Sequence, residues 1–162
     1  MIKGKVWKFG DNVNTDIIYP GKYLAITEPE EMPKHAFEFV YPDFVKKFKK
    51  GDIIVAGKYF GCGSSREQAA TCLKELGVSC IIAESFARIY YRNAINQGLP
   101  ILVCQGVSKK VKEGDKLEIN LSHGIIKNLV TKETIKATPL PPFILDILTS
   151  GGLIPHLRKR SS

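Results

Sequence analysis

The sequence predicts a single α/β domain, in which a mixed, partly parallel sheet layer with helices is joined to an added β-hairpin region. Between residues 52 and 104, apolar strand patterns alternate with helical patterns, which is typical of parallel strands joined by right-handed crossovers. Residues 116–130 alternate around a central turn, as a hairpin does. The chain has 162 residues, a length that suits one compact domain. We therefore treat residues 1–162 as one domain.

The first fifty residues predict short elements between loops, because short apolar runs alternate there with glycine, proline and asparagine. The expected elements are a strand at 6–9, a polar turn at 10–16, a loop at 22–27, a helix at 30–39 and a short helix at 42–48.

The middle of the chain predicts the α/β units. Gly77 and Gly98 follow helical patterns directly, and glycine readily adopts the left-handed conformation that ends many helices. The expected elements are a strand at 52–57, a glycine-rich turn at 61–65, a helix at 65–76, a strand at 79–83, a helix at 86–97 and a strand at 100–104.

The last third predicts β-structure followed by helices. Prolines at 139 and 141–142 separate the two parts, because proline interrupts regular backbone hydrogen bonding. The expected elements are hairpin strands at 116–121 and 125–130, a strand at 134–137, a helix at 143–148 and a final basic helix after Gly152.

The composition narrows the class of protein. Lys and Arg number 24 against 16 for Asp and Glu, which gives a formal net charge of +8. These cations are scattered, so the charge favours solubility over a dedicated nucleic-acid groove. We expect no membrane partner, because no apolar run approaches the roughly 20 residues of a spanning helix. The N-terminal residues lack the apolar core of a secretory signal, and we expect a cytoplasmic protein.

The cysteines do not predict a metal site in this chain. Cys62, Cys72, Cys80 and Cys104 form no C-x-x-C pair and no tight cluster with histidine, whereas zinc and iron–sulfur sites usually show close ligand pairs. We therefore expect this chain to bind no metal ion or cofactor.

The segment Gly61–Glu67, with sequence GCGSSRE, carries the strongest chemical signal. Ser64 and Glu67 have the spacing of a capping box, which predicts Ser64 at the N-cap of the following helix. Free backbone N–H groups at such a position favour an anion. Arg66 adds a planar fork suited to a carboxylate. A purely structural cap is the alternative. The segment fits neither a phosphate-binding loop nor a serine hydrolase motif.

Three separated segments resemble the small subunits of 3-isopropylmalate dehydratase, in the aconitase superfamily. The agreement in order and spacing runs from about residue 3 to the end. The segments are Lys8–Ile18 (KFGDNVNTDII), Gly61–Glu67 (GCGSSRE) and Ala83–Asn93 (AESFARIYYRN).

The resemblance implies a swivelling β/β/α domain and a division of labour between two chains. A separate large subunit would carry a [4Fe–4S] cluster, and this chain would supply the serine base, which corresponds to Ser64. Ser65 and Arg66 correspond to residues that hold a substrate carboxylate. Asp16 corresponds to an acidic active-site residue, and the alternative is a turn aspartate that binds its own backbone.

The loop Tyr23-Leu24-Ala25-Ile26-Thr27 corresponds to the segment that contacts the variable group of the substrate. Homoaconitases carry an arginine there, whereas Ala25 and Ile26 are apolar. An apolar wall gains roughly 0.8 kcal/mol for each buried CH₂ group, but it leaves a carboxylate without compensation for lost hydration. We therefore expect the isomerisation of 2-isopropylmalate to 3-isopropylmalate through isopropylmaleate, in leucine biosynthesis.

Several alternatives remain at this point. The substrate could instead be citramalate, 2,3-dimethylmalate or homoaconitate, and Lys22 weakens the case against a third carboxylate. An alternative of another class is a non-catalytic module that binds an anion or RNA. The expected partners are the large subunit and a small dicarboxylate, and the isolated chain could form a homo-oligomer.

Overall fold

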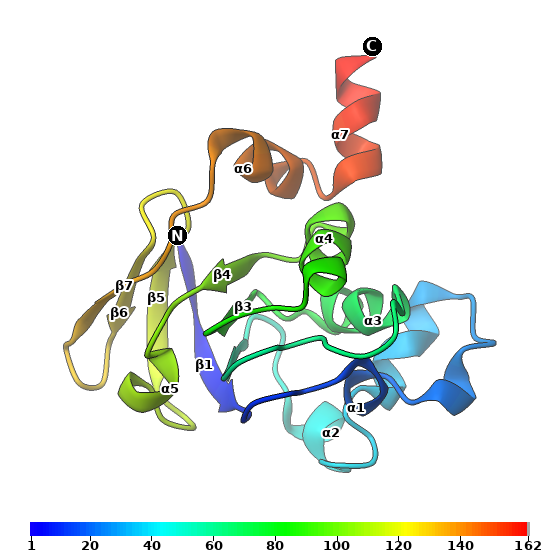
Figure 1. Ribbon diagram of the computed structural model, residues 1–162, viewed down its shortest axis with the longest axis horizontal. Helices are drawn as coiled ribbons and strands as arrows, with labels where there is room; N and C mark the ends of the chain where they lie inside the picture. Colours follow the sequence, from blue (N-terminus) through cyan, green and yellow to red (C-terminus); the bar gives the residue numbers. More distant parts are fainter. Residues whose placement is uncertain (162) are drawn as a thin grey trace.

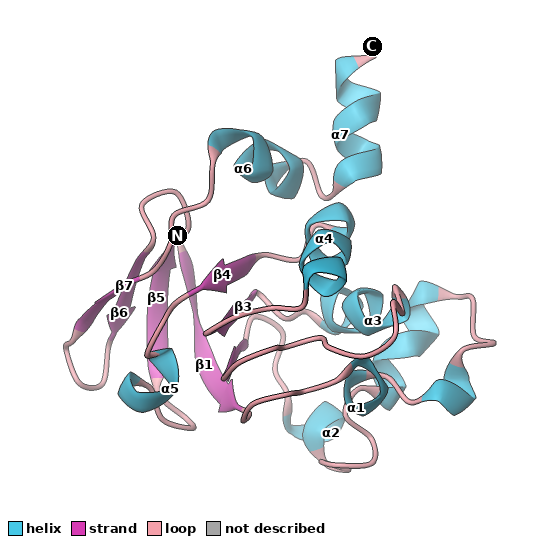
Figure 2. Cartoon of the chain, in the orientation of Figure 1, coloured by secondary structure: helices cyan, strands magenta, loops and turns pink. Residues whose placement is uncertain are grey.

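In the computed structural model, which describes residues 1–161, one mixed sheet forms the centre of the fold (Figures 1 and 2). Its strand order is β4-β3-β2-β1-β5-β6-β7. The strands are β1 (Ile2–Lys8), β2 (Ile53–Ala56), β3 (Cys80–Ala83), β4 (Ile101–Val103), β5 (Lys116–Asn120), β6 (Ile125–Asn128) and β7 (Thr134–Lys136).

Strands β1 to β4 form the parallel half of the sheet. Helix α3 (Gln68–Leu76) connects β2 to β3, and helix α4 (Arg88–Gln97) connects β3 to β4. Both helices end at a left-handed glycine, Gly77 and Gly98. Neighbouring strands in this half are consecutive in the chain, and α3 and α4 lie together beside them (Figure 1). The predicted α/β units are therefore confirmed.

Strands β5, β6 and β7 form the antiparallel half and join the parallel half through β1. Ile2 of β1 pairs with Ile119 of β5, and β5 continues into the hairpin with β6. The predicted hairpin and the following strand are thus confirmed, with somewhat shorter strands than expected. Strand β1 has the parallel neighbour β2 on one side and the antiparallel neighbour β5 on the other, so it links the two halves of the sheet.

The core divides into two clusters, one on each side of the sheet. Successive residues of a strand point to opposite faces, so Ile54 and Ile81 join the cluster that includes the helices, and Ile53 and Ile82 join the other. The second cluster also contains Leu117 of β5 and apolar residues of β6 and β7. Both faces of β2, β3 and β4 are therefore covered, which explains why these three strands are apolar throughout.

Short helices fill the remaining connections. They are α1 (Thr15–Ile18), η1 (Gly21–Tyr23), η2 (Pro29–His35), α2 (Phe44–Lys47), α5 (Val107–Lys110), α6 (Pro142–Thr149) and α7 (Leu153–Arg160). Helix α7 projects away from the body of the domain at the C-terminal end (Figure 1). None of the helices formed by residues 1–161 has the length and apolar character needed to cross a membrane.

The predicted helix at 30–39 is wrong. The chain forms the 3₁₀-helix η2 there and continues in turns, with Phe37 at a φ of 55°. Pro33 lies inside η2 and has no backbone N–H to continue an α-helical hydrogen-bond ladder. Tertiary contacts with the core replace the missing helical bonds, since Phe37 is fully buried and donates its N–H to the carbonyl of Ile18.

Gly61 offers a test of how closely the loop after β2 packs on α4. Its φ is 84°, and an added Cβ would lie 2.1 Å from Cγ of Tyr90. Gly114 has a similar φ of 86°, but a Cβ there would meet no heavy atom of residues 1–161 within 4 Å. We expect Gly114→Ala to lower the free energy of unfolding by about 1–2 kcal/mol from backbone strain, and Gly61→Ala to lower it by a further ~1–3 kcal/mol from overpacking. Urea denaturation of both variants measures the difference, and equal losses would contradict the close packing.

Candidate active site

Two segments that are far apart in the sequence lie side by side at the carboxyl end of β1 and β2. The parallel pairing of these strands continues beyond them through hydrogen bonds from Asn12 N–H to Lys58 O and from Gly61 N–H to Val13 O, at 2.8 and 2.7 Å. Thr15 N–H then donates to Cys62 O at 2.8 Å. As a result, the Asn14-Thr15-Asp16 segment lies directly against the glycine-rich segment.

Arg66 and Asp16 form the principal charged contact between these segments. Arg66 Nη1 donates to Asp16 Oδ1 at 2.6 Å and contacts Tyr19 O at 3.3 Å. Gly21 N–H donates to the same Asp16 oxygen at 2.9 Å. The Arg66 hydrogen bond, followed by the bond from Gly21, lowers the pKa of the Asp16 carboxyl. Asp16 therefore stays ionised and connects Arg66 to the start of the loop at 21–27.

Ser64 and Ser65 are exposed beside this ion pair. The Ser64 carbonyl accepts the N–H of Arg66 at 2.9 Å and the hydroxyl of Thr15 at 3.0 Å. The Ser64 hydroxyl itself lies 3.3 Å from Thr15 Oγ1. The structure thus brings Ser64, Arg66 and Asp16 together, with the Ser64 hydroxyl accessible to a ligand.

The predicted capping box is wrong. Helix α3 begins at Gln68 with Glu67 at the N-cap, and Ser64 lies three residues before that cap. The Glu67 side chain accepts a hydrogen bond from Gln97 instead of reaching back to Ser64. Contacts of Ser64 and Arg66 with the 15–19 segment replace the helical bonds that a start at residue 65 would need. Anion binding by the first backbone N–H groups of α3 therefore does not account for the position of Ser64.

The loop at 23–27 contributes to a hollow of about 340 Å³ next to α3. Leu24, Ile26 and Thr27 line this hollow, whereas Ala25 is exposed outside it. The other lining residues are Pro29, Met32, Glu67, Gln68, Thr71 and Gln97. Within the described residues, the lining includes an acidic side chain and no basic one, so a carboxylate would be disfavoured there.

Tyr23 is held by the protein itself. Its hydroxyl donates to Glu38, its ring stacks on His35 with 3.6 Å between centroids, and its carbonyl accepts the Tyr19 hydroxyl. The bond to Glu38 raises the pKa of the Tyr23 hydroxyl, and the same bond is the largest cause that lowers the pKa of Glu38. Lys22 lies over the Tyr23 ring. These contacts anchor the first residue of the 23–27 segment.

Sequence reasoning did not identify Thr15, Gly21 or Glu38 as parts of this site, and it gave Glu67 a capping role instead of a place in the lining of the hollow. Thr15 lies between Asn14 and Asp16, inside one of the three segments that carry the family resemblance. This position was the sequence signal that could have identified it. The contribution of Glu38 depends on the position of Tyr23, which the sequence does not give.

The described residues do not gather the side chains that a metal ion or cluster needs. Within residues 1–161, no group of three or more His, Cys, Asp and Glu side chains is arranged for a metal. Burial raises the pKa of the Cys72 and Cys80 thiols, which keeps them protonated and poor ligands.

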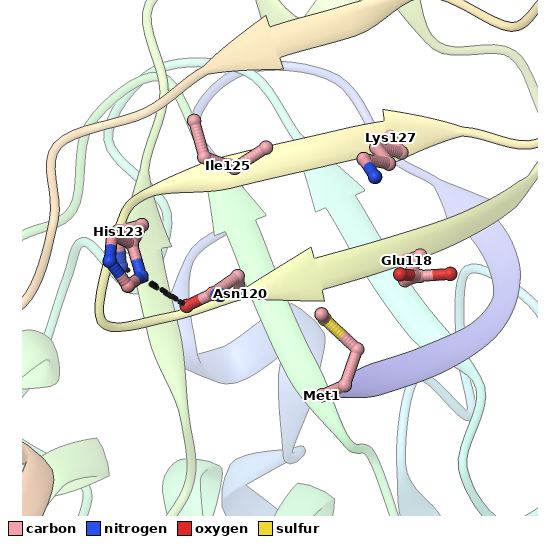
Figure 3. A pocket seen from close by; sticks show the side chains of 6 residues that line it. All are labelled: Met1, Glu118, Asn120, His123, Ile125 and Lys127. Atoms are coloured by element: carbon pink, nitrogen blue, oxygen red, sulfur yellow. Dashed lines mark hydrogen bonds between the residues drawn. The ribbon is translucent and has the colours of Figure 1, made fainter.

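A second hollow, of about 360 Å³, lies on the antiparallel half of the sheet (Figure 3). Glu118 and Asn120 come from β5, Lys127 comes from β6 and His123 from the turn between them, with Met1 across the opening. It shares no lining residue with the Ser64 segment. We assign no function to this hollow.

Comparisons with known proteins agree on one family. The profile of the aconitase C-terminal domain family matches residues 8–105. A Methanocaldococcus jannaschii protein, described as an isopropylmalate/citramalate isomerase small subunit, is 59% identical over 160 residues, which cover 99% of this chain and 95% of that protein. A Thermotoga maritima 3-isopropylmalate dehydratase small subunit 1 is 53% identical over 163 residues, covering 100% and 98% of the two chains.

A solved structure shows the same fold. The crystal structure of a 3-isopropylmalate dehydratase chain (leuD) from Methanocaldococcus jannaschii superposes with a TM-score of 0.93 at 46% sequence identity. The match covers 99% of this chain and 95% of that chain. The mixed α/β architecture described above is therefore shared with this solved relative.

The Asp16–Arg66 contact can be tested by titration. Arg66→Ala should raise the pKa of Asp16 toward its ordinary value of 3.8, because the first cause of the lowering is removed. A carboxyl whose folded pKa is lowered stabilises the fold above pH 3.8, and that contribution is lost as the pH falls through the folded pKa. Carbon-detected NMR of the Asp16 carboxyl measures the shift.

Lys34→Ala is the control for this titration, since Lys34 pairs with Glu31 on the surface. It should leave the Asp16 titration unchanged. An unaltered Asp16 pKa in Arg66→Ala would contradict the ion pair.

Proposed function

Since the chain belongs to the aconitase C-terminal domain family, among its 3-isopropylmalate dehydratase small subunits, we propose that it is the small subunit of a two-chain hydro-lyase that isomerises 2-isopropylmalate to 3-isopropylmalate. The observation that carries the proposal is the exposed Ser64 hydroxyl beside the Arg66–Asp16 pair. A hydroxyl that can serve as a base and a guanidinium that can bind a carboxylate lie together there, which supports the dehydration of a hydroxy-dicarboxylate.

Ser64 is proposed as the base. In its deprotonated form it takes a proton from the substrate carbon next to the one that bears the hydroxyl group, and the hydroxyl leaves that neighbouring carbon as hydroxide to give isopropylmaleate. Hydroxide then adds to the carbon that lost its proton, and Ser64 returns its proton to the other carbon, so the serine ends the cycle deprotonated as it began. The exposure of Ser64 gives the substrate access to this oxygen.

Arg66 and Ser65 are proposed to hold a substrate carboxylate. Within the described residues, the Arg66 contacts to Asp16 and Tyr19 both use Nη1. Nη2 and Nε therefore remain as donors for a carboxylate, with the guanidinium plane already fixed. Asp16 keeps the guanidinium in position, and the exposed Ser65 hydroxyl can add one more donor.

The large subunit is proposed as the partner that completes the site. The small-subunit names of the relatives and the aconitase family fit a cluster in the partner. A [4Fe–4S] cluster bound there would act as a Lewis acid on the leaving hydroxyl. The exposure of Ser64, Ser65 and most of the 24–27 loop fits a site that closes against another chain. We further propose that the assembled enzyme works in the cytoplasm.

The hollow lined by Leu24, Ile26 and Thr27 is proposed to receive the variable group of the substrate. Leu24 and Ile26 offer apolar contact for an isopropyl group, and Glu67 opposes a third carboxylate. A methyl group would also fit an apolar wall, and the 59% identical relative is described as acting on both isopropylmalate and citramalate. Citramalate is therefore the second candidate substrate.

Replacement of Ser64 tests the proposed base. We expect Ser64→Ala to assemble with the large subunit but to lower kcat by about 10²–10⁴-fold, because the proton-transfer group is lost. Ser65→Ala should mainly raise KM, and Ser122→Ala, an exposed serine in the hairpin turn, is the matched control. The measurement is anaerobic turnover with cluster-loaded large subunit. Full activity of Ser64→Ala would overturn the assignment.

A substrate panel tests the proposed hollow. The reconstituted enzyme should turn over 2-isopropylmalate, with citramalate as a second substrate, and should leave homoaconitate unchanged because the hollow offers no basic side chain. Steady-state kinetics under anaerobic conditions give kcat/KM for each compound. Turnover of homoaconitate would retain the mechanism but contradict the proposed role of the hollow.

A further inference from the structure

Thr15 contacts the loop that carries Ser64 with both its backbone and its side chain. Its N–H donates to Cys62 O at 2.8 Å, and its hydroxyl lies 3.0 Å from Ser64 O and 3.3 Å from Ser64 Oγ. The residue is only 2% exposed. The Thr15 hydroxyl is therefore fixed against Ser64 from the interior side, whereas the other side of Ser64 is open.

The chemistry of the groups determines which one donates. A carbonyl oxygen can only accept, so the single hydrogen of the Thr15 hydroxyl is used on Ser64 O. Thr15 Oγ1 still has a lone pair, so we assign the contact between the two hydroxyl oxygens as a donation from Ser64 to Thr15. This arrangement directs the Ser64 hydrogen inward and leaves lone pairs of Ser64 Oγ toward the open side.

We propose that Thr15 is a positioning residue that orients the Ser64 hydroxyl and then stabilises its deprotonated oxygen, a role that rests on the proposed function of Ser64 as the base. When Ser64 loses its proton, rotation of the Thr15 hydroxyl about its Cβ–Oγ1 bond turns the hydrogen from Ser64 O to Ser64 Oγ. No heavy atom needs to move. When Ser64 takes the substrate proton, the Thr15 hydrogen turns back to the carbonyl.

After this rotation of the Thr15 hydroxyl, the Ser64 carbonyl still has a hydrogen-bond partner. Ser64 O keeps the hydrogen bond from Arg66 N–H at 2.9 Å after the Thr15 hydroxyl has turned away. Gly63, directly before Ser64, has a φ of 98°, a left-handed conformation that favours glycine, so the turn that presents Ser64 to Thr15 forms without strain. A hydrogen bond to a charged oxygen is stronger than one to a neutral carbonyl, so the rotation favours the deprotonated serine.

A thiol placed at position 64 gives a test that needs no partner chain. In the full chain carrying Cys62→Ala and Ser64→Cys, the new thiolate should accept the Thr15 hydroxyl, and adding Thr15→Val should raise the thiol pKa by about one unit. Adding Thr15→Ser instead should preserve the lower pKa. The pH dependence of iodoacetamide alkylation, read by mass spectrometry at position 64, measures it. The buried Cys72 and Cys80 thiols should react little.

Kinetics of the reconstituted enzyme provide the second readout. We expect Thr15→Val to lower kcat by about 10- to 100-fold, as expected for loss of one hydrogen bond to a charged group, with KM little changed. The rise of kcat with pH should move to higher pH, because less of the serine is deprotonated at a given pH. Thr15→Ser should restore both properties. If Thr15→Val does not assemble with the large subunit, Thr15→Ala takes its place in both experiments.

Ser79→Ala is the control for the loss of a structural hydroxyl. Ser79 Oγ donates to Gly51 O at 2.7 Å, before β3 and at the opposite end of the parallel strands. Its kcat and pH profile should match those of the wild type. An unchanged thiol pKa together with an unshifted pH profile in Thr15→Val would overturn the inference. Full activity of Ser64→Ala would instead overturn the underlying base assignment, so the two failures are distinguishable.

Discussion

The parallel pairing of β1 with β2 is the constraint on which the rest of the site depends. Val6 to Lys8 of β1 pair in register with Ile53 to Val55 of β2, and the hydrogen bonds continue along the loops that follow both strands. A shift of this register by one residue would turn the side chains of β2 to the opposite core. It would also separate Thr15 from Ser64. The apolar residues on both faces of β2 therefore determine the alignment of two polar loops.

The polar groups of the site form a chain of hydrogen bonds in which each group holds its neighbour in position. Asp16 accepts hydrogen bonds from Arg66 and Gly21 with a single oxygen, so the guanidinium and the loop at 21–27 share one anchor. Arg66 also donates its backbone N–H to Ser64 O. An exposed ion pair alone contributes little to stability. Its value here is geometric, because it fixes a guanidinium next to an exposed hydroxyl before any ligand arrives.

The two halves of the sheet have different functions in this architecture. The parallel half provides the strand ends from which the site loops emerge, and α3 and α4 cover its outer face (Figure 1). The antiparallel half covers the other face through Leu117, Ile119 and Ile126. With both faces of β2 and β3 buried, the strands form a rigid base. Ser64 and the 24–27 loop are thus carried by strands that are packed on both faces.

The sequence by itself determined the order of strands and helices in the α/β half, the β5–β6 hairpin and the segments proposed to bear the chemistry. These features depend on local periodicity, glycine positions and residue types, which are readable without a fold. The start of α3 at Gln68, the 3₁₀ form of η2 and the contacts of Thr15 and Glu38 were decided only by the tertiary structure. For Thr15 and for the start of α3 the physical reason is long-range: Thr15 contacts Ser64 and Asp16 contacts Arg66 across about fifty residues of sequence, and the pairing of β1 with β2 brings these segments together.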